Sequence, residues 1–171
     1  MSQKDNFTFR RAEKTDMKAV VEMIQELADF ERMSDGPQLS EQDLIRDSGL
    51  DGGHEYCQVY VLTDNTTNAS IGYAICFYSY STWQGRSLFL EDLYVRPAYR
   101  KQGTGARMFR EVAAIAVRQG CRRLDFHVLS WNPACEFYNH LGATNLTKSE
   151  CWQFYRVEEQ QLAKLAEELK S

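Results

Sequence analysis

The sequence predicts a single α/β domain built on a mixed α+β sheet, on three observations. One strand-like segment is followed by two helical segments, three consecutive strands and then alternating helices and strands, which is not the order of a doubly wound fold. The 171 residues, 43% apolar and 26% charged, suit one globular domain. No linker, repeat or low-complexity tract divides the chain, so we expect one domain over residues 1–171.

The first half of the chain carries two helical segments between one isolated strand and a group of three strands. Val20, Ile24 and Leu27 repeat at helical spacing, so the first helix, capped by Thr15, faces the core. An Asp-Gly-Pro break ends it, and an acidic Ser-Glu-Gln-Asp start opens the second helix. In order, the expected elements are strand 7–11, helix 15–32, helix 40–49 and strands 56–63, 71–80 and 87–95, the first two of this group forming a hairpin.

Glycines divide the second half into further elements. Met108 and Val112 lie on the apolar face of a helix that Gly120 ends, and Gly142 ends the next helix. A charged helix with a leucine face directed inward closes the chain. In order, the expected elements are helix 104–119, strand 124–130, helix 133–142, strand 151–157 and helix 158–169.

Composition excludes several classes of protein. Twenty basic and 24 acidic residues give a net charge of −4, which argues against nucleic-acid binding and favours a cationic partner. No run approaches the ~18 apolar residues of a membrane span, and residues 1–11 are too polar for a secretory signal, so we expect a cytoplasmic protein without a membrane partner. The five scattered cysteines form no C-x-x-C pair, so neither a disulfide framework nor a metal site is expected.

The stretch 94–109, YVRPAYRKQGTGARMF, has the physics of a phosphate site. A strand leads into a helix through a basic, glycine-containing turn, where free N–H groups and the helix dipole favour an anion. A mononucleotide P-loop motif is absent, and a dinucleotide fingerprint would need a glycine where Met108 stands. Taken alone, the two glycines are better explained by an ordinary loop turn.

The context of this turn resembles the GNAT acetyltransferase superfamily. The motif R-x-x-G-x-G at 100–105 follows the strand LEDLYV and precedes WNPACEFYNHLGA. The segments IQELADFERMSD, YSTWQGRSLFLEDLYVRPAYR and VLSWN resemble the diamine acetyltransferases and their thialysine N-ε-acetyltransferase relatives. The resemblance covers nearly the whole chain. It implies an acyl-CoA N-acyltransferase fold, with a mostly antiparallel central sheet that is splayed at the cofactor site and flanked by helices.

The resemblance also implies a set of acetyl-CoA contacts. Main-chain groups of one strand would hold pantetheine, and the turn with the following helix start would hold the pyrophosphate. The implied cofactor residues are Leu93, Tyr94, Val95, Arg100, Lys101, Gln102, Gly103, Thr104, Gly105, Ala106 and Asn132. Two features depart from the family pattern: glycine is frequent where Lys101 stands, and the spacing from Asn132 to Tyr138 is one residue shorter than usual.

Acetyl transfer to an amine needs a base, because a primary ammonium has a pKa of about 10.4 in water. Glu91 and Asp92 are adjacent on a strand and project to opposite faces unless a bulge intervenes. The resemblance assigns the base, acting through water, to Glu91, and the acid that protonates the coenzyme A thiolate to Tyr138. On the residues alone, Glu91 is better explained as a solvent-facing carboxylate on a strand, and a helix aromatic packed on the sheet is the alternative for Tyr138. Cys135, near a helix start, leaves a ping-pong acetyl-cysteine route open.

The acceptor is expected to be a small cationic amine. By resemblance its site is lined by Phe30, Glu31, Trp83, Glu91, Asp92, Asp125, Phe126 and His127. Polyamine acetyltransferases carry an aspartate in a YDPW segment where this chain has Tyr-Ser-Thr-Trp at 80–83, which favours thialysine, a lysine-like amine or a short diamine. Spermidine and spermine, peptide amines and a non-catalytic acyl-CoA-binding role remain alternatives. The resemblance further implies a homodimer.

Overall fold

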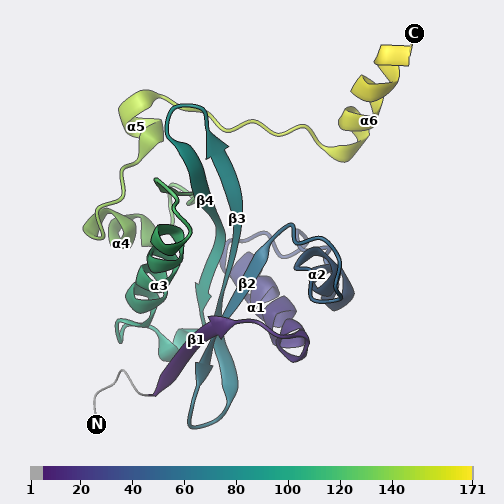
Figure 1. Cartoon of the computed structure of the whole chain (residues 1–171). Coiled ribbons are helices and arrows are strands. Elements are labelled where there is room, and N and C mark those ends of the chain that lie inside the picture. Colours follow the sequence, from purple (N-terminus) through teal and green to yellow (C-terminus); the bar gives the residue numbers. More distant parts are fainter. Residues whose placement is uncertain (1–5, 171) are drawn as a thin grey trace. The chain divides into compact units, whose positions relative to one another are not determined.

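The structure is a computed structural model that describes residues 6–170 (Figure 1). Residues 1–5 and 171, which the expected single domain includes, lie outside the described residues. The chain forms two compact units, Met1–Asn132 and Pro133–Ser171. The assignment of residues 1–171 to one domain therefore stays a prediction.

Five strands of the described chain form one sheet in the order β1-β2-β3-β4-β5, with the first four antiparallel and β5 parallel to β4. Their bounds are Phe7–Arg11, Gln58–Asp64, Ala69–Ser81, Gly85–Val95 and Leu124–Phe126. The predicted mixed, mostly antiparallel sheet is confirmed. The strand expected at 124–130 stops at Phe126, because its pairing with β4 ends there.

Helices cover both faces of this sheet. In the first unit they are the short 3-10 helix η2 (Lys14–Asp16), α1 (Met17–Phe30), α2 (Glu41–Asp47), η3 (Pro97–Tyr99) and α3 (Thr104–Arg118). The residues that cap the first helical segment are Glu13 and Asp16, which form a reciprocal capping box, and not Thr15 as expected. In the part of the chain that the structure describes, no helix is long and apolar enough to cross a membrane.

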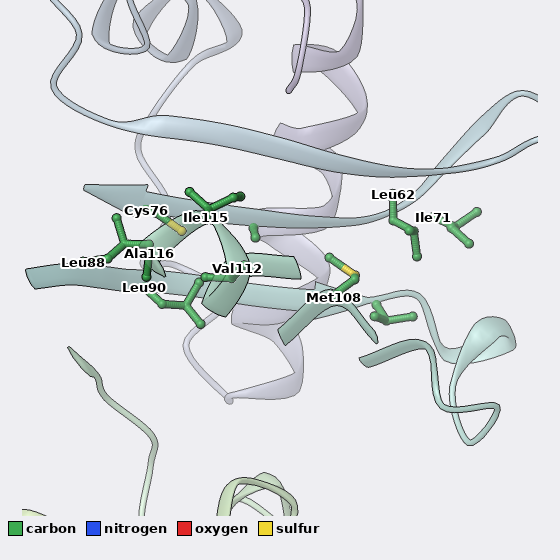
Figure 2. Packing of buried hydrophobic residues seen from close by; sticks show 11 residues of the cluster. Leu62, Ile71, Cys76, Leu88, Leu90, Met108, Val112, Ile115 and Ala116 are labelled. Atoms are coloured by element: carbon green, nitrogen blue, oxygen red, sulfur yellow. The ribbon is translucent and has the colours of Figure 1, made fainter. Parts of the chain in front are cut away.

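Two apolar clusters lie on opposite faces of the sheet. Met108, Val112 and Ile115 of α3 belong to one apolar cluster with Leu88 and Leu90 of β4, which Figure 2 shows. On the other face, α1 and α2 pack on β2, β3 and β4 through Met17, Val20, Met23, Leu44, Val59, Val61, Tyr73, Ile75 and Tyr94. We call these the α3 face and the α1 face.

The second unit contains helices α4 (Ala134–His140), α5 (Leu146–Glu150) and α6 (Glu159–Glu167), followed by η4 (Glu168–Lys170). Helix α5 was not expected from the sequence; Asn145 caps it by accepting a hydrogen bond from the Lys148 N–H at 3.1 Å. The strand expected at 151–157 is wrong: the segment is irregular, and no described strand pairs with it. A strand needs a partner for its ladder, so an alternating sequence alone does not form one. The leucines expected to face inward, Leu162, Leu165 and Leu169, are exposed.

Candidate functional site

The C-terminal half of β4 is paired on one side only. β5 pairs with Leu88, Phe89 and Leu90 and then ends, whereas β4 continues to Val95. A Cβ on Gly72 of β3 would lie 2.7 Å from the Tyr94 carbonyl oxygen, so the Tyr94 carbonyl faces β3. Main-chain groups alternate along a strand, so those of residues 93 and 95 face the side that β5 has left. We call residues 91–95 the open edge of β4.

A β-bulge separates the paired half of β4 from the open edge. Ile75 lies opposite Asp92 and Cys76 lies opposite Leu90, so Glu91 has no partner on β3. Leu90 and Leu93 both pack on the α3 face although they are three residues apart. The bulge therefore directs Glu91 and Asp92 together toward the α1 face. Glu91 and Asp92 were expected to project to opposite faces of the sheet unless a bulge intervened, and the bulge is present.

The two carboxyl groups belong to an acidic cluster completed by Glu31 at the end of α1. The Tyr73 hydroxyl of β3 donates a hydrogen bond to Asp92 Oδ2 at 2.9 Å. The pKa of Asp92 is raised to about 6, chiefly by burial; the Tyr73 hydrogen bond opposes this rise, and the charges of Glu91 and Glu31 contribute to it. Burial also raises the pKa of Glu31. Glu91 is exposed, and in residues 6–170 no hydrogen bond or ion pair holds its carboxylate.

Aromatic rings and guanidinium groups lie beside the open edge. The Arg100 guanidinium carbon stands 5.0 Å from the ring centre of Tyr94 and 5.6 Å from that of Phe30, the last residue of α1. The Phe30 ring is 6.1 Å from that of Trp131, over which the Arg32 guanidinium stacks at 5.3 Å. Phe30, expected at the acceptor, thus lies near Arg100, expected at the cofactor. Trp131 is half-exposed.

The turn before α3 leaves backbone donors at the helix start. Lys101 and Gly103 have φ angles of 62° and 78°, in the left-handed region. The first helical bond runs from Arg107 N–H to the Gly103 carbonyl at 2.9 Å, and no side chain caps the helix. The N–H groups of residues 104–106 precede that bond and are not used by the helix itself.

The Arg100 side chain is bonded to the end of the open edge. Its Nε donates to the Val95 carbonyl at 2.6 Å, which ties the turn to the end of the open edge. Of the other turn residues expected at the cofactor, Lys101 and Gln102 are exposed, and a Cβ placed on Gly103 would meet no atom within 4 Å. The position of Gly103 is therefore open to a ligand.

The remaining acceptor residues of the first unit are dispersed. The His127 ring lies 5.0 Å from that of Phe89, on the α1 face, and Asp125 pairs with Arg123 at 2.7 Å. Phe126 packs on Phe109 in the α3 face, away from Asp92. Trp83 is exposed at the turn of the β3–β4 hairpin, where its backbone N–H donates to Ser81 Oγ at 3.2 Å.

Tyr138 lies on α4 in the second unit, with its ring 5.0 Å from that of Phe137. Asn132 is the last residue of the first unit, and its N–H donates to the Leu129 carbonyl at 2.8 Å. The roles given to both residues, and the effect of their shortened spacing, stay predictions. Cys135, also on α4, is half-buried. Within residues 6–170, no three His, Cys, Asp or Glu side chains gather as a metal site would require.

Most of the chain is similar in sequence to curated proteins. A thialysine N-epsilon-acetyltransferase of Bos taurus is 36% identical, and the match covers 92% of this chain and 95% of that protein. The enzyme of the same name in Caenorhabditis elegans is 33% identical over 87% of this chain and 90% of that one. A spermidine/spermine N(1)-acetyltransferase-like protein of Homo sapiens is 34% identical over 95% of this chain, which spans 24% of that longer protein.

Solved structures share the fold. An integron cassette protein from the mobile metagenome of V. cholerae superposes with a TM-score of 0.72 at 26% identity, over 94% of this chain and 98% of that one. An acetyltransferase of Trypanosoma brucei superposes with a TM-score of 0.67 at 20% identity, over 90% and 99%. The Acetyltransferase (GNAT) family matches residues 20–143 of this chain. The expected resemblance is confirmed, and the chain belongs to the GNAT acetyltransferase family.

Proposed function

We propose that this protein is an acetyl-CoA-dependent N-acetyltransferase that transfers acetyl directly to the primary amine of a small cationic substrate. The observation that carries the proposal is the junction of the open edge of β4 with the uncapped start of α3. Backbone groups able to bind a long, amide-rich and phosphorylated donor lie beside two carboxyl groups able to attract an ammonium. A binding module would not need those carboxyl groups.

The first unit fits acetyl-CoA at two places. The main-chain groups of residues 93 and 95 offer strand-like hydrogen bonds to the pantetheine amides, although the Val95 carbonyl already accepts from Arg100. The N–H groups of residues 104–106, the open space at Gly103 and the exposed Lys101 suit the pyrophosphate. Bound there, acetyl-CoA supplies the activated acetyl group. Asn132 is assigned to the same cofactor by the family resemblance.

Glu91 is the base in this proposal. Its carboxylate is exposed at the bulge, where it can take a proton from the substrate ammonium through a water molecule. Asp92 and Glu31 keep the surroundings negative, which favours binding of the cation. Tyr138 donates the proton that the departing thiolate needs. The direct route requires no acetyl-cysteine, so Cys135 has no assigned step.

The substrate class follows from charge and from the relatives. Three carboxyl groups near the bulge suit an amine that carries a further positive group, and thialysine N-epsilon-acetyltransferases are among the most similar curated enzymes. We therefore propose thialysine, a lysine-like amine or a short diamine, bound also by Phe30. Only the family resemblance adds Asp125, His127, Trp83 and Phe126 to this site. The likeness to a spermidine/spermine N(1)-acetyltransferase-like protein keeps polyamines as the alternative.

A panel of amines tests both proposals. Purified protein with acetyl-CoA is assayed on thialysine, lysine, short diamines, spermidine, spermine and a lysine-containing peptide, and the substrates are ranked by kcat/KM. Thialysine or a short diamine should rank first and the peptide last. A higher rank for spermidine would establish the alternative, and turnover of none would contradict the enzymatic proposal.

We further propose a homodimer that forms through the second unit. The segment 151–157 has a strand-like sequence but no strand partner in the described chain, and Trp152, Phe154, Tyr155 and Val157 are exposed along it. Pairing with a second copy would supply the missing ladder and cover these side chains. Light scattering at micromolar concentration should give twice the monomer mass of 19.8 kDa. A monomer mass would refute the dimer.

We place this enzyme in the cytoplasm. All five cysteines are free thiols, which suits a reducing compartment. The net charge of −4 favours a small cationic substrate over nucleic acid or an anionic membrane surface. Cell fractionation is the measurement that checks the location.

A further inference from the structure

We propose that Tyr73 is a positioning residue of the acceptor site, which fixes the Asp92 carboxylate so that one of its oxygens faces the substrate ammonium. The inference rests on the proposed function, because it takes Asp92 to lie beside the bound amine. Tyr73 itself touches no reacting atom in this proposal and acts through Asp92.

The contact between Tyr73 and Asp92 depends on the bulge in β4. Tyr73 lies opposite Tyr94, so Asp92 is its diagonal neighbour across the β3–β4 pair. If the alternation set by Leu90 continued without the bulge, Asp92 would point into the α3 face. The extra residue, Glu91, turns Asp92 toward the hydroxyl of Tyr73. The same irregularity that exposes the proposed base thus also creates this pair.

Burial makes the pair a specific one. Tyr73 is fully buried within the α1 face, so its hydroxyl would lose solvation without gaining a bond if Asp92 did not accept from it. The bond runs to Asp92 Oδ2 at 2.9 Å. In the part of the chain that the structure describes, Oδ1 accepts from no other group, and it is the oxygen left for a ligand.

Negative charge surrounds the Asp92 carboxyl. The titratable groups that face the pair are Glu91 and Tyr94 on β4 and Glu31 at the end of α1. On the same strand, the ring of Tyr94 carries the Arg100 guanidinium stacked over it. Burial and the two glutamates favour the neutral acid and hold the pKa of Asp92 near 6, and the Tyr73 hydrogen bond opposes them. The Tyr73 hydrogen bond therefore favours the ionised form of Asp92, which can attract an ammonium.

The test is Tyr73→Phe, which removes the hydroxyl and keeps the ring. Its matched control is Tyr60→Phe on β2, whose half-buried hydroxyl donates to Gln58 at 3.0 Å and touches no carboxylate. With the best amine of the panel, Tyr73→Phe should lower kcat/KM for the amine at pH 7 by about 10- to 100-fold and leave the KM for acetyl-CoA unchanged. The acid limb of the kcat/KM profile should move to higher pH. Tyr60→Phe should do neither.

A second readout needs no turnover. The Asp92 carboxyl is titrated by carbon NMR in protein labelled at aspartate, with Asp92→Asn to identify its signal. The titration should move to higher pH in Tyr73→Phe, because the bond that favours the charged form is lost. This result would stand even if no amine were acetylated, so it separates a failure of the inference from a failure of the proposed function.

Two results would overturn the inference. One is an Asp92 titration that does not change in Tyr73→Phe. The other is a loss of kcat/KM on Tyr73→Phe that is as large in the Asp92→Asn background as in the natural sequence, because a residue that acts through Asp92 has nothing left to position there. A smaller loss in that background supports the inference.

Discussion

The two halves of β4 differ in how their main chains are paired and in which side chains they present. In the paired half, Leu88 and Leu90 are buried against α3 and the main chain bonds to strands on both sides. In the open edge, the main chain has a strand on one side only, and the carboxyl groups of Glu91 and Asp92 share the α1 face. One bulged residue separates scaffold from site. A one-residue bulge in an ordinary strand is enough to turn two neighbouring carboxyl groups to the same face of the sheet.

The same contrast appears at two helix starts. At α2, Ser40 and Asp43 satisfy the first N–H groups in a reciprocal capping box. At α3, the residue before the helix is Gly103, which has no side chain to do so. We infer that the first helix start serves stability and the second is reserved for an anion.

The largest effect should come from a residue that is not on β4. If Tyr138 is the proton donor that the family resemblance implies, Tyr138→Phe removes the donated proton and keeps the ring, so kcat should fall by roughly 10² to 10⁴. Affinity for acetyl-CoA should stay nearly unchanged. Tyr56→Phe, which removes an exposed hydroxyl with no assigned role, serves as the control in the same steady-state assay. A near-normal kcat in Tyr138→Phe would make this tyrosine structural.

A cavity in the paired half should cost stability instead of activity. Leu90 is 2% exposed, so Leu90→Ala should lower the free energy of unfolding by about 2–5 kcal/mol. Leu93 of the open edge is only partly buried, so Leu93→Ala should lower the free energy of unfolding by less. Urea denaturation of both variants measures the difference. Equal losses would erase the distinction between the two halves.

A third comparison concerns the two helix starts. Gly103→Val places a β-branched residue at a φ of 78° and in the open space before α3, so affinity for coenzyme A should fall by more than about tenfold. Ser40→Ala should cost about 0.5–2 kcal/mol of stability and leave that affinity intact. Calorimetric titration with coenzyme A separates the two. Unchanged affinity in Gly103→Val would remove the phosphate site from the turn.

The smallest effect is expected at Lys101. It is a non-glycine residue with a left-handed φ of 62°, where glycine fits without strain but adds freedom to the unfolded chain. These effects oppose each other, so Lys101→Gly should change the free energy of unfolding by less than about 1 kcal/mol. Loss of the charge should weaken coenzyme A binding less than Gly103→Val does. Thermal unfolding measures the change in stability, and calorimetric titration measures the affinity for coenzyme A. A larger loss of affinity than in Gly103→Val, or a larger change in stability, would contradict these expectations.

Local patterns predicted most of the fold, and register decided the rest. The helical spacing of Met108 and Val112 and the aromatic strands at 71–95 predicted their elements. The bulge at Glu91 could not be read from the sequence, because it depends on how β4 lies against β3. The same holds for the diagonal pair of Tyr73 and Asp92. The strand predicted at 151–157 was wrong for a related reason, because an alternating pattern indicates a strand but does not specify the strand that pairs with it.

The most direct test of the account is the pH dependence of kcat/KM for the best amine in Glu91→Gln. A base at the open edge is needed only while the amine arrives protonated, and a free primary ammonium loses its proton near pH 10.4. We expect kcat/KM in Glu91→Gln to be far below that of the natural sequence at neutral pH, and the deficit to narrow as the pH rises toward the amine pKa. A deficit that stays constant across this range, or a normal rate at pH 7, would show that Glu91 is not the base and that the open edge of β4 does not carry the chemistry assigned to it.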